Sequence, residues 1–201
     1  TRLVSDWSSD VCSSDLGLAP SSIVYSLGVG EDISFDLSLI ASFQLQVYAF
    51  DPTPRSIDWI GRQSLPPQFH FVAYGVADYD GTAEFFPPDN PEHVSHTIFE
   101  RSSTAEQSIS VPVRRLSTLM TELEHHTLDL LKMDIEGAEY AVLDDLLQSS
   151  IRPLQLVVEF HHDIHKLGWE RTKAMLERLR EAGYIMIYVS RSRHQYTFLL
   201  R

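Results

Sequence analysis

The sequence predicts an α/β fold in which helices cover both faces of a mostly parallel sheet, and three observations support this prediction. From residue 17 onward, short apolar runs of strand length alternate with helix-like segments, and turn residues separate them. The 201 residues, 43% apolar and 22% charged, are typical of one globular domain. Apolar strands that alternate with helices favour parallel pairing with right-handed crossovers.

The first sixteen residues differ from the rest. They hold three Asp and six Ser or Thr and show neither helical nor strand periodicity. They lack the apolar core of a signal peptide. Back-translation of residues 6–16 gives a common short-read sequencing adapter, so residues 1–16 resemble a translated adapter. We expect this segment to be non-native and disordered, and the native N-terminus to be missing.

The first half of the domain is expected to alternate strands with helices. The β-branched run at 22–27 predicts a strand, and the Gly-Val-Gly that follows predicts a tight turn. A helix is expected at 35–43, a strand at 46–50 and a helix at 55–60, where a proline is tolerated in the first turn. The apolar run at 69–76 predicts one further strand.

The middle of the chain is the least regular part. Asp80-Gly81 is a hairpin signal and precedes a short strand at 82–86. Residues 87–107 contain three prolines and many polar side chains, which predicts a long loop or lid. A strand at 108–113 follows.

The second half returns to the alternating pattern. A helix at 116–124 carries its apolar residues on one face, and a buried strand is expected at 128–133. A helix at 138–147 and the very apolar strand at 154–160 continue the pattern.

The last segments complete a single domain at 17–201. A helix at 169–182 ends before Gly183, a favoured residue after a helix. The runs at 184–189 and 196–200 flank a polar turn and predict an antiparallel hairpin.

Composition excludes two classes of partner. The formal charge of −12 argues against binding of a nucleic-acid backbone, which requires clustered Lys and Arg. The apolar runs are far shorter than the ~20 residues of a membrane helix. We therefore expect no nucleic-acid or membrane partner. A cytoplasmic location is favoured, but the compartment stays open because the native N-terminus is expected to be missing.

Two glycines and an aspartate predict a nucleoside site. Gly28 and Gly30 follow the first strand, and Asp51 follows the second, at a spacing that suits bidentate hydrogen bonding to ribose hydroxyls. The third glycine of the dinucleotide-binding motif is absent, since Glu31 and Asp32 follow Gly30. Two carboxylates at this place would repel a pyrophosphate. The ligand is therefore expected to be a nucleoside without phosphates, such as S-adenosylmethionine with its sulfonium cation.

Three blocks resemble the FkbM-type methyltransferase family: residues 48–52 (YAFDP), 132–139 (KMDIEGAE) and 158–161 (VEFH). The resemblance implies a class I S-adenosylmethionine-dependent methyltransferase with a Rossmann-like, seven-stranded sheet of order 3-2-1-4-5-7-6. It also implies O-methylation of a hydroxyl on a small-molecule or glycan-type acceptor. Residues 25–30 depart from the commoner family form, since Ser26 stands at the usual acidic position.

The same resemblance assigns residues to the cofactor. Asp51 is expected to hold the ribose and residues 76–78, including Asp78, to border the adenine. Asp134 is expected near the methionine part and the methyl-transfer zone, with Glu136 beside it. Asp78 also suits an ordinary turn.

Catalytic side chains are expected at the ends of two neighbouring strands. Asp134 and Glu136 are two residues apart, as are Glu159 and His161, so each pair can point to one side. We take His161 as the candidate base, with Asp134 or Glu159 orienting it. Two alternatives stay open: Glu159 and His161 as structural partners, and Glu136 as a helix N-terminal residue. These side chains also suit a divalent metal, which we do not favour.

The sequence therefore predicts a methyltransferase. The alternatives are an inactive S-adenosylmethionine-binding module and, less favoured, a nicotinamide-dependent oxidoreductase.

Overall fold

The structure is a computed structural model that describes residues 17–86, 108–164 and 167–201. The predictions for residues 1–16 and for the loop at 87–107 lie outside these ranges. The elements are, in chain order, β1 (Ile23–Leu27), α2 (Ser34–Phe43), β2 (Gln46–Phe50), α3 (Pro54–Ile60), β3 (Phe69–Val72), β4 (Gly75–Val76), β5 (Gly81–Phe85), β6 (Ile109–Arg114), α4 (Leu116–Glu122), β7 (Leu130–Met133), α5 (Glu139–Gln148), β8 (Gln155–Glu159), α6 (Gly168–Glu181), β9 (Tyr184–Val189) and β10 (Gln195–Leu200).

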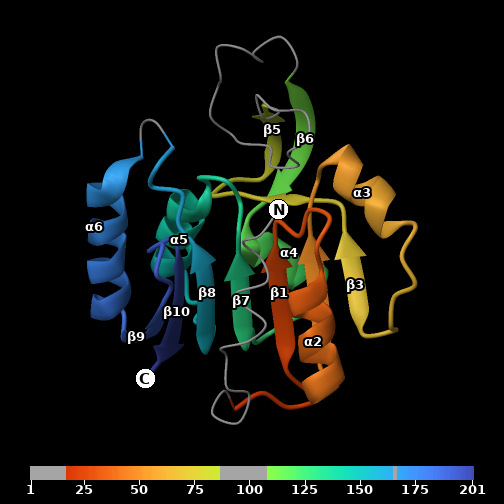
Figure 1. Cartoon of the computed structure of the whole chain (residues 1–201), viewed down its shortest axis with the longest axis horizontal. Helices are drawn as coiled ribbons and strands as arrows, with labels where there is room; N and C mark the ends of the chain where they lie inside the picture. Colours follow the sequence, from red (N-terminus) through yellow and green to blue (C-terminus); the bar gives the residue numbers. More distant parts are fainter. Residues whose placement is uncertain (1–16, 87–107, 165–166) are drawn as a thin grey trace.

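Seven strands form the main sheet in the order β3-β2-β1-β7-β8-β10-β9. The pairs from β3 to β8 are parallel, whereas β10 is antiparallel to both of its neighbours. Numbered along the chain by themselves, these strands have the order 3-2-1-4-5-7-6, so the predicted fold class is confirmed. Figure 1 shows the parallel strands pointing to one common edge of the sheet.

Helices cover both faces of this sheet, as predicted. Val24 and Leu130 belong to a buried core that also contains residues of α2 and α3. The adjacent residues Tyr25 and Leu131 point the other way, into a core built with α4, α5 and α6. This alternation follows from the two-residue period of a strand and explains why the central strands are apolar throughout.

One predicted strand proved to be two. The segment 69–76 breaks after Val72, where the backbone N–H of Tyr74 donates to the Val72 carbonyl at 2.8 Å. β4 then joins a separate three-stranded sheet of order β4-β6-β5, which projects beyond the carboxyl edge of the main sheet (Figure 1). Glycine at position 75 lets the chain pass closely from the main sheet to the small one, because a Cβ there would lie 3.0 Å from the Val113 side chain and 3.2 Å from the Pro52 side chain.

The other predicted elements are found with ends that differ by at most two residues. For example, α4 ends at Glu122 and α5 begins at Glu139. Within the described ranges, no helix is both long and apolar enough to cross a membrane.

Candidate active site

The predicted site residues gather at the carboxyl edge of the main sheet. By the element bounds, Gly28 and Gly30 follow β1, Asp51 follows β2, Asp134 and Glu136 follow β7, and Glu159 and His161 lie at and after the end of β8. In parallel α/β sheets this edge is where ligands bind. Asp78 follows β4 and lies in the part of the structure formed by the small sheet.

Gly28 fixes the loop after β1 against the loop after β7. Its φ is +74°, and a Cβ at this position would lie 1.8 Å from the backbone oxygen of Asp134. The two loops are therefore in backbone contact, and only glycine fits between them.

Gly30 and Asp51 are joined directly. The backbone N–H of Gly30 donates to Asp51 Oδ2 at 2.9 Å, and Asp51 Oδ1 accepts from the N–H and the hydroxyl of Thr53 at 2.9 and 2.6 Å. The carboxylate is buried, whereas a Cβ on Gly30 would meet no atom within 4 Å. The structure thus places a fixed carboxylate beside open space, an arrangement we call the Gly30–Asp51 cradle.

The cradle is flanked by an exposed ion pair. Arg55 donates from Nε and Nη2 to the two oxygens of Glu31 at 3.0 and 2.9 Å. This hydrogen-bonded pairing lowers the pKa of Glu31. Asp32 instead accepts from the N–H of Ser34 at the start of α2. The pair moderates the repulsion that Glu31 would exert on an anionic ligand, so the argument against a dinucleotide rests more on Asp32.

Asp78 is exposed and lines a cavity of about 290 Å³ between the small sheet and the start of α5. Apolar side chains form much of the remaining wall, among them Val76, Phe85 and Val113, and Ala138 contributes from α5. The residues predicted to border an adenine therefore line a real cavity.

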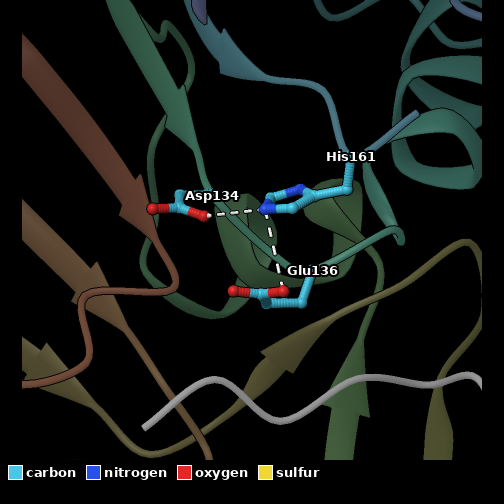
Figure 2. Close-up of side chains that lie close together, drawn as sticks. All are labelled: Asp134, Glu136 and His161. Atoms are coloured by element: carbon cyan, nitrogen blue, oxygen red, sulfur yellow. Dashed lines mark ion pairs between the residues drawn. The ribbon is translucent and has the colours of Figure 1, made fainter. Parts of the chain in front are cut away.

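Three side chains converge beyond β7 and β8 (Figure 2). His161 Nε2 lies 3.6 Å from Asp134 Oδ1 and 3.7 Å from Glu136 Oε2. One ligand atom from each of the three residues lies within 4.8 Å of the other two, so the group has the composition and spacing to hold a metal ion. We call these three residues the Asp134–Glu136–His161 cluster.

Glu139 holds the imidazole of this cluster in place. Its fully buried carboxylate accepts from His161 Nδ1 at 2.8 Å and from the backbone N–H groups of Ile135 and Gly137 at 3.0 Å each. Sequence reasoning named Asp134 or Glu159 for the role of orienting His161 and missed Glu139. A signal was available, because an acidic residue in the first turn of a helix is favourably placed to accept backbone N–H groups.

The cluster has unusual electrostatics. Burial alone lowers the pKa of His161, but the hydrogen bond to Glu139 and the surrounding carboxylates outweigh it and raise the pKa to about 10. Burial and the neighbouring charge of Glu159 raise the pKa of Asp134 to about 7. Without another cation, His161 therefore holds a proton at neutral pH, and this proton offsets part of the charge of the carboxylates.

Glu159 lies at the end of β8, where its Oε2 accepts from Gln195 Nε2 at 3.3 Å. Its negative charge raises the pKa of Asp134, and its described hydrogen bond is with Gln195 rather than with His161. The described contacts therefore do not pair Glu159 with His161. The hydrogen bond of His161 Nδ1 is to Glu139 instead.

Comparison with known proteins identifies the family. Residues 31–186 match the model of the methyltransferase FkbM domain. Human probable methyltransferase-like protein 24 is 28% identical over 150 residues, which cover 73% of this chain and 34% of the relative. The rat protein of the same name is 29% identical over the same shares. The chain thus spans about a third of the length of these curated relatives.

Solved structures agree on the fold. A methyltransferase FkbM from Methylobacillus flagellatus superposes with a TM-score of 0.58 at 13% identity, covering 96% of this chain and 47% of that one. Aeropyrum pernix fibrillarin, crystallised with natively bound S-adenosyl-L-methionine, gives a TM-score of 0.50 at 12% identity, covering 90% and 66%. The domain match covers most of the chain, and the described fold is that of class I methyltransferases. The chain therefore belongs to the FkbM methyltransferase family.

Proposed function

We propose that residues 17–201 form a methyltransferase domain that uses S-adenosylmethionine to methylate a hydroxyl group of a small-molecule or glycan-type acceptor. The observation that carries this proposal is the Gly30–Asp51 cradle, a buried carboxylate beside open space at the carboxyl edge of the sheet. Membership of the FkbM family supports the reaction class, and the hydroxyl acceptor follows from the resemblance in sequence.

The cradle fits the ribose of the cofactor. A carboxylate has about four positions at which it accepts hydrogen bonds. Thr53 takes two on Oδ1 and Gly30 takes one on Oδ2. The remaining position on Oδ2 suits one ribose hydroxyl. Asp51 would therefore bind the ribose through one carboxylate oxygen rather than through both oxygens. Gly28 and Gly30 keep the adjacent backbone close enough for contact.

The cavity beside Asp78 fits the base. Val76, Phe85 and Val113 offer apolar surface to a planar ring, and the Asp78 carboxylate offers an acceptor to an exocyclic amine. We propose that this cavity receives the adenine.

Asp134 and Glu136 are the carboxylates that we place beside the sulfonium cation of the cofactor. When bound, S-adenosylmethionine supplies an activated methyl group on a sulfonium cation. Carboxylates near the site favour a cationic ligand by Coulomb attraction, which partial burial strengthens. We propose that Asp134 and Glu136, together with the neighbouring carboxylates of Glu139 and Glu159, give this part of the site the net negative charge that provides the attraction.

The acceptor end of the site is assigned to Asp134, Glu159 and His161. Methyl transfer to a hydroxyl requires alignment of the oxygen with the methyl group and the loss of one proton. We propose that these three residues bind the hydroxyl together and that the Asp134 carboxylate takes up its proton, because His161 already holds one at neutral pH. Glu139 is the positioning residue for His161.

Calorimetry with S-adenosylhomocysteine and with NADH tests the proposal. We expect the chain to bind S-adenosylhomocysteine and not NADH. Binding of NADH alone would indicate a nicotinamide-dependent enzyme. Binding of S-adenosylhomocysteine without transfer of a labelled methyl group to hydroxyl-bearing small molecules or glycans would favour an inactive binding module.

A further inference from the structure

We propose that Asp134, Glu136 and His161 bind a divalent transition-metal ion at the carboxyl edge of the sheet. The role that we give this ion in methylation rests on the proposed function, but the binding itself does not.

The ion-pair distances in the cluster are longer than hydrogen bonds and also match the separation of two ligands on one metal ion. His161 Nε2 lies 3.6 Å from Asp134 Oδ1 and 3.7 Å from Glu136 Oε2, beyond the roughly 2.7–3.2 Å of an N–H···O hydrogen bond. Two ligand atoms bound ~2.1 Å from one ion lie ~3.0–3.7 Å apart when they subtend about 90–120° at the ion. The two distances from His161 Nε2 therefore suit one ion shared by the three side chains, whose ligand atoms all lie within 4.8 Å of one another.

Glu139 is a second and separate observation that points to a metal. It is not itself a ligand in this arrangement, yet its buried carboxylate accepts the Nδ1–H of His161 at 2.8 Å. This bond fixes the tautomer and turns Nε2 toward Asp134 and Glu136 (Figure 2). Metal-binding histidines typically give their other N–H to such a carboxylate, which orients the ring and makes it a stronger ligand.

The backbone that carries the ligands is held firmly. The N–H of Asp134 donates to the Leu27 carbonyl at 3.1 Å, and Gly28 lies against the Asp134 carbonyl. The N–H of Phe160, directly before His161, donates to the His194 carbonyl at 2.8 Å. A site fixed in this way loses little conformational entropy when it binds an ion.

The ligand types select among ions. Two carboxylates and one imidazole suit a divalent transition metal better than Mg²⁺ or Ca²⁺, which prefer oxygen ligands alone. Mn²⁺ matches the two carboxylates and is the probe we choose. Three protein ligands leave positions open, and an acceptor hydroxyl that took one of them would lose its proton more readily.

The test is Mn²⁺ binding to the full chain, measured by electron paramagnetic resonance of free Mn²⁺ during titration. We expect one Mn²⁺ per chain and a higher melting temperature in its presence. Glu136→Gln, which preserves size, is expected to weaken binding at least tenfold, and Glu139→Gln by roughly 10–100-fold. Asp163→Asn is the matched control, since it removes a neighbouring carboxylate that is 69% exposed and outside the cluster, and it is expected to bind like the wild type.

The outcomes that would overturn the cation site do not depend on methyltransferase activity. Absence of Mn²⁺ binding to the folded wild type, or equal affinity in Glu136→Gln, would overturn the cation site. If Glu139→Gln unfolds, Glu136→Gln alone decides the outcome. Calorimetry with S-adenosylhomocysteine in EDTA separates the two proposals, because retained cofactor binding without Mn²⁺ binding would remove the cation site and leave the proposed function standing.

Discussion

The carboxylate of Glu139 accepts a hydrogen bond from His161 Nδ1 at 2.8 Å and is itself fully buried. This bond joins the first turn of α5 to the segment just after β8, and both flank the proposed acceptor site. It makes His161 a side chain with a fixed orientation, and it couples the charge of the imidazole to the carboxylates of Asp134 and Glu136.

His161→Ala is expected to lower methyl transfer by about 10²-fold while leaving the affinity for S-adenosylhomocysteine unchanged. The reason is that His161 lies at the acceptor end, whereas the ribose is assigned to Asp51. Turnover with the labelled cofactor and calorimetry on the same preparation measure the two effects. Wild-type turnover would move the acceptor role to other residues.

Gly28→Ala is expected to destabilise the fold by about 2–5 kcal/mol. Its left-handed φ of +74° strains any L-residue by about 1–2 kcal/mol, and overpacking against the Asp134 carbonyl adds about 1–3 kcal/mol. Gly30→Ala is the matched control, because its φ of +55° carries the same strain but its Cβ would meet open space. Urea denaturation should therefore show a loss of only about 1–2 kcal/mol for Gly30→Ala. Equal losses would refute the close contact at Gly28.

His125 is expected to make stability depend on pH. Its Nδ1 lies 2.7 Å from the hydroxyl of Tyr25, and burial together with the charges of His70 and His126 lowers its pKa. The unfolded chain then binds the proton more tightly than the folded one, so this contribution is fully present above the unfolded pKa of about 6.5 and is lost as pH falls below it. His125→Gln should flatten the fall in urea midpoint between pH 8 and pH 5. The exposed neighbour His126 provides the comparison: its charge is the smallest of the three causes that lower the pKa of His125, so His126→Gln is expected to change the slope less than His125→Gln does.

The fold was predictable because the signals that define it are local. Alternating periodicity located all the main-sheet strands, and the resemblance in sequence implied their order. The break in segment 69–76 was not predictable, since its apolar residues suit a strand equally well in either sheet. What separates β3 from β4 is the close approach of Gly75 to Val113, a contact made across the tertiary fold.

The site was predictable only in part, for the same reason. Strand ends located Asp51, Asp134 and His161, because parallel strands bring their carboxyl ends to one edge. The hydrogen-bond partner of His161 is Glu139, which the start of α5 turns inward. Residue spacing along the strands does not predict this contact. Glu159, at the expected two-residue spacing, instead accepts from Gln195.

The affinity of Asp51→Ala for S-adenosylhomocysteine, measured by calorimetry, tests the central claim that the Gly30–Asp51 cradle holds the cofactor. Removal of this carboxylate takes away a charged acceptor and the anchor of the Gly30 N–H, so we predict a loss of about 1–3 kcal/mol in binding free energy. Asp58→Ala, on the exposed side of α3, should bind like the wild type. Equal affinity for S-adenosylhomocysteine in the wild type and in Asp51→Ala would contradict the account.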